Sequence, residues 1–383
     1  MFRLLDPKKR KNPNLSPVSV AYSTLRFTGL MNQEGRPWSL VICAYHIVAM
    51  NCMGITSGIR LFSRTGSLPE MIEAISAFTI YLHVNAKAVN VLRNQKEIRQ
   101  LLEKLEEIRY GILQDVENRH HLLKTDNFLA KLTFSYGTLF LSYPFLALIM
   151  NLIIDFTSPS VKPHLVLQVW VPWSMKEFWP YIIGMVAVML LSVTALIYYV
   201  SFSILLYTYS FQMSAFLKIL QARLIKNGPR DPELFRFHAE LLRLLRNFNK
   251  LFSGQLYLET ILSSLQPCGF GFALIKAFKK KDPGAFDLLY KSFMAVLAPF
   301  IVCACGQVIS TQVGKLHESS YLSRWYEEHP KIRKNLLTMM GMTVRPTTLN
   351  YRIFTAFDYI CFARVVQGIY SYLMMIINLE TDD

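Results

Sequence analysis

The chain reads GIYSYLMMIINL at residues 368–379, within a C-terminal segment that is mostly apolar from Ile353 onward. About twenty such residues in a helix match the ~30 Å hydrocarbon core of a bilayer. Polar residues recur inside this segment, at Asp358, Arg364, Gln367, Ser371, Tyr372 and Asn378. Polar groups at membrane depth are tolerated only where they face protein or water. The helix is therefore expected either to line an aqueous pathway or to bond through these groups to neighbouring helices.

The composition of the whole chain is that of an integral membrane protein. Its 383 residues are 52% hydrophobic with a mean hydropathy of +0.28, and the apolar blocks are too long for an ordinary soluble domain. The net charge of +15 lies mainly in loops between these blocks, as topology signals do. We therefore expect no nucleic-acid partner, although residues 8–11 read KKRK. The six cysteines lie in apolar segments without zinc-site spacing, so no disulfide, metal or cofactor is expected.

Seven apolar segments predict an all-α, polytopic membrane protein with seven transmembrane helices. We expect the spans at 38–62, 70–92, 128–155, 179–211, 254–278, 286–307 and within 347–383. Three charged segments between them have helical periodicity, at 93–126, 223–252 and 307–347. A loop rich in proline and tryptophan covers 156–176. The charged segments should form helices outside the bilayer.

The distribution of basic residues sets the expected orientation. Most Lys and Arg residues lie in the loops on the side that carries the N-terminus, which should therefore be cytoplasmic. Seven crossings then place the C-terminus outside the cell, opposite to a G-protein-coupled receptor. The long charged helices would project together into the cytoplasm and form an interaction domain.

Several spaced motifs in residues 306–379 resemble the C-terminal third of insect odorant receptors. They are Lys315–Tyr321 (KLHESSY), Arg324–Glu327 (RWYE), Arg333–Met340 (RKNLLTMM), Arg345-Pro346 and Ile369–Leu373 (IYSYL). The chain departs from the family pattern before the last helix, where Leu349-Asn350-Tyr351 replaces a glycine. It also lacks the long cytoplasmic insertion of the shared co-receptor, so it resembles a ligand-tuning subunit.

The resemblance implies an odorant-gated, non-selective cation channel in the plasma membrane of olfactory neuron dendrites. Tuning subunits and the odorant co-receptor would form a heterotetramer that conducts monovalent and divalent cations. The implied units are a cytoplasmic N-terminal segment (1–37), spans one to six with the ligand pocket (38–305), a cytoplasmic anchor (306–346) and a pore-lining helix (347–383). By motif position, Met375 and Leu379 match the apolar constriction of the pore and Asn378 the polar residue beside it. Ser371 and Tyr372 lie one to two turns below.

The family resemblance also implies an apolar odorant cavity in the outer half of the bundle. It should lie among the second, third, fourth and sixth spans and take a small, uncharged volatile, because shape and desolvation carry affinity in such sites. The aromatic and methionine residues expected to face inward are Phe78, Tyr81, Phe140, Tyr143, Met185, Met189, Tyr290 and Phe293. Aromatic stripes in membrane spans are more often plain packing, which is the competing interpretation for each residue.

The alternative functions are those of a gustatory receptor, a G-protein-coupled receptor and an enzyme. A gustatory receptor shares the architecture and would form a self-sufficient ligand-gated channel, so it is the closest alternative. A G-protein-coupled receptor would need the opposite orientation, an Asp-Arg-Tyr run after the third span and an Asn-Pro-x-x-Tyr run in the last, and the chain has neither run. An enzyme is disfavoured because His120-His121 has no spaced carboxylate or third ligand, and no nucleophile triad or phosphate-binding loop is present.

Overall fold

The computed structural model describes most of the chain. The described residues are 16–31, 37–63, 68–157, 167, 169–175, 177–323, 325–344, 348–351 and 355–381. Most of the predicted loop at 156–176 and the KKRK cluster lie outside them.

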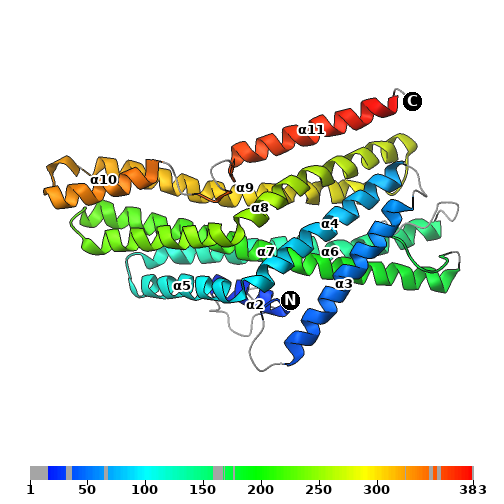
Figure 1. The fold of residues 1–383 in the computed structure, drawn as a ribbon, viewed down its shortest axis with the longest axis horizontal. Coiled ribbons are helices and arrows are strands. Elements are labelled where there is room, and N and C mark those ends of the chain that lie inside the picture. The colour runs from blue at the N-terminus through cyan, green and yellow to red at the C-terminus, as the bar shows by residue number, and fades with distance from the viewer. Residues whose placement is uncertain are drawn as a thin grey trace.

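Four helices run the length of an elongated bundle (Figure 1). They are α6 (Arg119–Thr157), α7 (Phe178–Asn227), α8 (Pro232–Lys280) and α9 (Ala285–Leu322). At ~1.5 Å per residue, the 50 residues of α7 reach ~75 Å, more than twice the thickness of a bilayer core. Helix α8 contains the whole span at 254–278 and most of the charged segment at 223–252, whose first residues belong to the end of α7. Pro267 lies inside α8 and does not end it.

Two tilted helices cover one side of the long bundle. They are α3 (Pro37–Phe62) and α4 (Leu68–Arg93), and α4 packs against α3, α7 and α8. Among the described residues, α3, α6, α7, α8, α9 and the last helix are long and apolar enough to cross a membrane. The remaining predicted span, α4, is less apolar because it carries Glu73, His83 and Lys87. Together these helices form the seven-helix membrane fold expected from the sequence.

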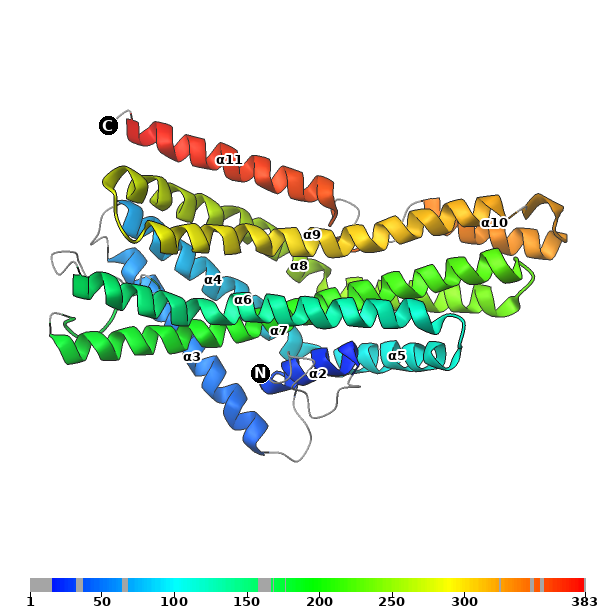
Figure 2. The same cartoon turned by 180° about the vertical axis from the view of Figure 1, so that it is seen from behind.

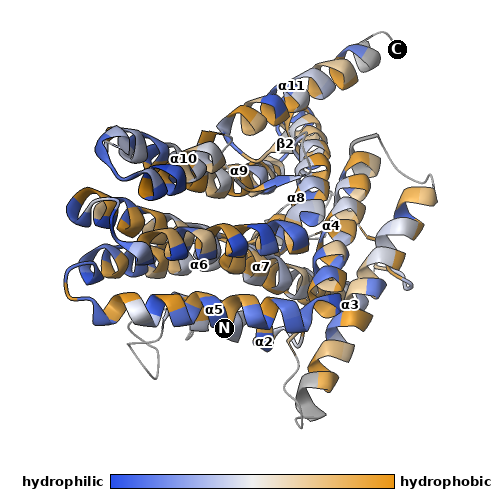
Figure 3. Ribbon diagram, turned by 60° about the vertical axis from the view of Figure 1, so that its left-hand side comes forward, coloured by the Kyte–Doolittle hydropathy of each residue, from blue (hydrophilic) through white to orange (hydrophobic). Residues whose placement is uncertain are grey.

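Shorter helices lie on the half of the bundle that is rich in hydrophilic residues, with α10 at its end and α2 near the middle of the bundle (Figures 2 and 3). They are α2 (Pro17–Phe27), α5 (Gln95–Gln114), the 3-10 turn η1 (Trp325–Glu327) and α10 (Pro330–Val344). The predicted amphipathic face of α5 is confirmed, since residues such as Leu101, Leu105 and Ile108 are buried. The single helix expected at 93–126 is not formed, because the chain turns at Asp115 and α6 begins at Arg119.

Ion pairs join the helices at this hydrophilic end. Arg109 of α5 contacts Asp126 of α6 at 2.6 Å, and Lys104 of α5 contacts Glu240 of α8 at 2.8 Å. Asn118 donates a hydrogen bond to Asp115 and lowers the pKa of that carboxyl group, and Arg223 of α7 adds a contact at 3.2 Å. These contacts tie α5, α6, α7 and α8 into one body beyond the apolar spans.

A short hairpin precedes the last helix, α11 (Tyr359–Thr381). Strands β1 (Asn350–Tyr351) and β2 (Thr355–Ala356) pair antiparallel at the place where the sequence departs from the family glycine. The amide nitrogen of Asn249 on α8 donates to the carbonyl of Thr348 at 2.7 Å and to Asn350 Oδ1 at 2.9 Å. Side-chain hydrogen bonds from α8 thus position the turn, and these four residues are the only strand residues that interrupt the helical fold in the described part of the chain.

The backbone that follows the hairpin packs closely against α9 at Gly306. A Cβ atom at this position would lie 1.7 Å from the carbonyl oxygen of Phe357, the residue after β2, whose ring is fully buried. Only glycine allows this close approach of α9 to the backbone that leads into α11.

We predict that Gly306→Ala lowers the apparent Tm of the detergent-solubilised protein strongly, because the added methyl group collides with backbone rather than with a flexible side chain. The cost of such overpacking is ~1–3 kcal/mol or more. Gly314→Ala on the same helix is the matched control, since nothing lies within 4 Å of its Cβ position. Alanine there should keep or raise Tm, because it favours helix over glycine by ~1 kcal/mol. Equal Tm values for the two variants would contradict the assignment of Gly306.

Candidate functional site

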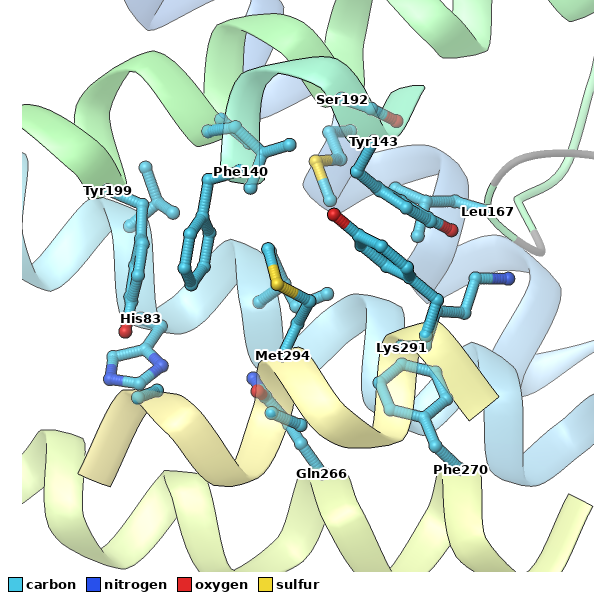
Figure 4. Close-up of a pocket in the computed structure, with 18 residues that line it drawn as sticks. His83, Phe140, Tyr143, Leu167, Ser192, Tyr199, Gln266, Phe270, Lys291 and Met294 are labelled. Atoms are coloured by element: carbon cyan, nitrogen blue, oxygen red, sulfur yellow. The ribbon is translucent and has the colours of Figure 1, made fainter. Parts of the chain in front are cut away.

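A cavity of about 110 Å³ lies inside the bundle, between α3, α4, α6, α7, α8 and α9 (Figure 4). Its walls are mostly apolar and include Met53, Phe140, Phe270 and Met294. Apolar cavities of roughly 150 Å³ in other proteins stay dry and bind molecules the size of benzene. The size and lining are therefore those of a site for a small apolar molecule.

Two aromatic pairs shape the cavity. Phe140 of α6 stacks on Tyr199 of α7 with ring centroids 5.4 Å apart, and Tyr143 of α6 stacks on Tyr290 of α9 at 5.1 Å. The Tyr290 hydroxyl donates to the carbonyl of Leu139 at 2.7 Å. These contacts fix the rings, so the walls are largely pre-formed.

One end of the cavity borders a buried polar cluster on α6 and α9. The Lys291 ammonium contacts Asp287 at 2.6 Å, one turn away on α9. The Tyr143 hydroxyl donates to the same carboxylate at 2.9 Å. Asp287 thus balances the positive charge of Lys291 where Lys291 lines the cavity, so a ligand need not carry a negative charge.

The other end borders a second buried ion pair. Lys87 of α4 donates to Glu259 of α8 at 2.9 Å, and both side chains are 2% exposed. The Lys87 ammonium also lies 3.8 Å from the ring centroid of Tyr199, and the Tyr199 hydroxyl donates to Glu259 at 3.5 Å. His83, one turn before Lys87, lies 3.9 Å from Glu259 and lines the cavity. The cavity therefore adjoins the contact that joins α4 to α8.

The predicted ligand residues fall into two groups. Phe140, Tyr143 and Tyr290 line the cavity, whereas Met185 and Met189 are buried on α7 without lining it. Phe78 and Tyr81 pack toward Gly58 and Gly54 of α3, and Phe293 is 55% exposed on the outside of the bundle. The rotation of each helix relative to its neighbours decides which of these residues face the cavity. The aromatic content of a span alone does not predict it.

Several lining residues were absent from the sequence-based set. Most of them, such as His83, Tyr199 and Met294, come from α4, α7 and α9. Met53 of α3 and Gln266 and Phe270 of α8 come from helices that were not expected to border the cavity. A usable signal existed for His83 and Gln266, because polar residues inside apolar spans mark functional or paired positions.

Helix α11 has a packed face and an open face. The packed face lies against α8 and α9, where the Cys268 thiol of α8 reaches the carbonyl of Ile369 at 3.4 Å and Gly271 faces Leu373. Only 11% of its apolar stretch is buried, against 39 to 50% in the other five membrane-length helices. Most of an apolar helix is therefore uncovered in the single chain.

The polar residues of α11 lie together on the open face. Arg364, Gln367, Ser371 and Asn378 are exposed and follow one another at three, four and seven residues, which keeps them on one stripe. Met375, 52% exposed, lies beside that stripe, and Tyr372 is also exposed. The side chain of Leu379 lies outside the described residues. The remaining predicted pore residues thus point away from their own bundle.

The sequence pattern of the family described as "7tm Odorant receptor" matches residues 67–370, which is most of the chain. The chain belongs to the odorant receptor family. Among curated relatives, odorant receptor 94a of Drosophila melanogaster is 25% identical over 43% of this chain and 44% of its own length. Putative odorant receptor 85d of the same fly is 20% identical over 94% of this chain and 93% of its own length.

The matches to the first relatives are partial: odorant receptors 94a, 47a and 9a of D. melanogaster are covered over 44, 59 and 45% of their lengths. The fold agrees over nearly the whole chain. The insect olfactory receptor OR5 from Machilis hrabei superimposes with a TM-score of 0.77 at 14% identity, covering 94% of this odorant receptor and 97% of OR5. Its structure in complex with eugenol gives a TM-score of 0.75 at 13% identity, with the same coverage.

The family and the apolar helices place this odorant receptor in a membrane, which it crosses several times. It belongs to a receptor family rather than to a family of enzymes. Within the described ranges, no group of three or more His, Cys, Asp or Glu residues is arranged to hold a metal ion.

The buried ion pair gives a stability prediction. Lys87→Met or Glu259→Gln alone should lower the apparent Tm of the solubilised receptor, because each leaves one buried charge unpaired at a typical cost of ~3–5 kcal/mol. The double variant should regain at least half of the loss, since neither charge then remains. Thermal unfolding of the four proteins forms a double-mutant cycle. Additive losses would show that the two charges do not stabilise each other.

Proposed function

We propose that this odorant receptor is the tuning subunit of an odorant-gated, non-selective cation channel, assembled as a heterotetramer with the shared odorant co-receptor. The observation that carries the proposal is the open face of α11. The polar stripe on the uncovered side of this apolar helix would be unfavourable against lipid, and it does not face the interior of its own bundle. Several subunits around an axis would place these stripes against water and form a pore.

The apolar residue beside the stripe gives the pore a gate. A ring of Met375 side chains, with Leu379 one turn further, would exclude ions by dewetting, and modest widening would admit water. Asn378, Ser371 and Tyr372 would then supply polar surface on either side of the constriction.

The cavity between α3, α4, α6, α7, α8 and α9 is the proposed odorant site. Helix α8 connects it to the pore helix within about one turn: Gln266 and Phe270 line the cavity, while Cys268 and Gly271 contact α11. A ligand that favours one position of this turn would shift the position of α11. Binding must favour the open arrangement over the closed one for gating to occur.

The hydrophilic end of the bundle is the proposed cytoplasmic anchor. It would include 306–346, where α10 packs along the end of α9 and the His317 ring contacts the Thr343 hydroxyl at 3.0 Å. The positive-inside rule then gives a cytoplasmic segment 1–37, a membrane body 38–305 and an extracellular end of 347–383. The proposed location is the plasma membrane of olfactory neuron dendrites.

Electrophysiology tests this function directly. We expect a fast cation current evoked by volatile esters, ketones or aromatics in cells that co-express the receptor and the odorant co-receptor, and none from the receptor alone. Current from the receptor alone would instead favour a self-sufficient channel of the gustatory type. Silence under both conditions, with both proteins at the cell surface, would contradict the channel proposal.

The gate is tested by one position in the co-expressed channel. Met375→Ser should raise the resting current several-fold, because a hydroxyl group wets the constriction. Met375→Leu is the matched control and should leave the resting current near that of the unmodified channel, since the ring stays apolar. Equal resting currents for Met375→Ser and Met375→Leu at equal surface expression would remove Met375 from the gate.

A further inference from the structure

The polar groups that line the cavity differ in whether they already have partners. Seven lining side chains carry nitrogen or oxygen: His83, Tyr143, Ser192, Tyr199, Gln266, Tyr290 and Lys291. Five of them have hydrogen-bond partners or an ion pair within the protein, as described for both ends of the cavity and for Tyr290, and through the Ser192 hydroxyl, which donates to the carbonyl of Val188 at 2.8 Å.

The other two each contain a buried nitrogen atom without a partner. Gln266 Nε2 and His83 Nε2 have no hydrogen-bond partner among the described residues, and the two side chains are 6% and 4% exposed. In Figure 4 the Gln266 amide lies below Met294 and the His83 imidazole lies below Tyr199. His83 Nε2 is 3.9 Å from the nearest Glu259 oxygen, beyond hydrogen-bond distance.

A buried donor without a partner costs free energy that a bound acceptor can recover. The amide nitrogen of Gln266 carries two N–H groups and no lone pair to offer, so it requires an acceptor. A site built to hydrogen-bond an oxygen also rejects an analogue that lacks it, because the buried polar group then stays unpaired. The other five polar side chains of the lining already have partners, and the remaining lining residues are apolar.

We propose that Gln266 is a specificity-determining residue that selects ligands with one hydrogen-bond-accepting oxygen, such as ketones, esters and aldehydes, over hydrocarbons of the same shape. The His83 ring is the second contact for this oxygen when its Nε2 carries the proton. This inference rests on the proposed function of the cavity as the odorant site. It adds that the oxygen lies at the α4–α8 end of the cavity and the hydrocarbon part against the aromatic rings.

Ligand-dependent thermal stabilisation of the full-length solubilised receptor tests the inference without channel activity, because a ligand that binds only the folded state raises its stability. The probes are methyl ketones and the 2-methyl-1-alkenes of equal chain length, in which a CH₂ group replaces the carbonyl oxygen. The unmodified receptor should bind at least one ketone ~10-fold or more tightly than its alkene partner. Gln266→Leu should weaken ketone binding by a similar factor and leave alkene binding unchanged or stronger.

Gln255→Leu is the matched control. Gln255 is also a buried glutamine of α8 with an unpartnered Nε2, but it lies outside the cavity lining and its side-chain oxygen accepts from Asn90. Its ketone-to-alkene ratio should equal that of the unmodified receptor. Gln266→Met replaces Gln266→Leu if the latter does not fold, and it should give the same loss of preference.

Two outcomes would overturn the inference. One is an equal ketone-to-alkene ratio in the unmodified receptor and the Gln266 variants. The other is a panel in which no ketone, ester or aldehyde stabilises the unmodified receptor. The selective stabilisation that we expect, found together with an absence of odour-evoked current, would support the oxygen-binding site and contradict the channel function, so the two proposals fail separately.

Discussion

The ion pair between Lys87 and Glu259 is the constraint on which the arrangement of α4 depends. A lone ammonium or carboxylate at membrane depth would be expensive, and pairing with hydrogen-bond support makes it tolerable. The pair fixes the rotation and depth of α4 against α8, because the Lys87 ammonium and a Glu259 oxygen lie 2.9 Å apart and both side chains are buried at this interface. Close helix packing follows on the same interface, where Gly269 of α8 leaves room for Ser76 of α4.

Helix α8 contacts each part of the receptor that the proposed function needs. Its middle borders the cavity and α4, and the same region touches α11. Further toward the hydrophilic end, Asn249 holds the hairpin that leads into α11. Under the proposed function, a helix with these attachments would carry a small displacement at the cavity to the start and the middle of α11. Pro267, within the cavity-bordering turn, removes one backbone hydrogen bond and gives that turn a place to bend.

The uncovered surface of α11 distinguishes this receptor from a self-contained bundle. Within a membrane, polar stripes of this kind face other protein groups or water. In this chain the packed face of α11 is narrow, and its open face combines apolar and polar residues. This composition fits the proposed function, in which the open face contacts neighbouring subunits and lines a central water path. The short hairpin and the Gly306 contact hold the start of this helix, while the rest of its described length packs mainly along α8 and α9.

Sequence reasoning located most of the elements because hydropathy and helical period are local properties. It placed at least one end of each span within a few residues of a helix end, found α4 in spite of its charges, and identified the buried face of α5. It treated the charged segment at 223–252 and the span at 254–278 as separate elements, although most of both lies in the single helix α8, because hydropathy changes between them while the helical backbone continues. It also joined α5 to the start of α6, because the break rests on an Asp115–Asn118 side-chain contact that gives little periodic signal.

The sequence by itself determined the class of the protein: an all-helical membrane receptor with seven apolar segments, charged helices at one end, and a last helix with polar residues on one stripe. Only the tertiary structure decided which residues border the cavity. Phe293 and Tyr290 are three positions apart on α9, yet one is on the outer surface and the other lines the cavity, because the rotation of each helix is fixed by contacts with distant segments. The pairing of Lys87 with Glu259 and the unpartnered amide of Gln266 arise in the same way: hydropathy predicts that a residue is inside the membrane, and only packing determines what lies beside it.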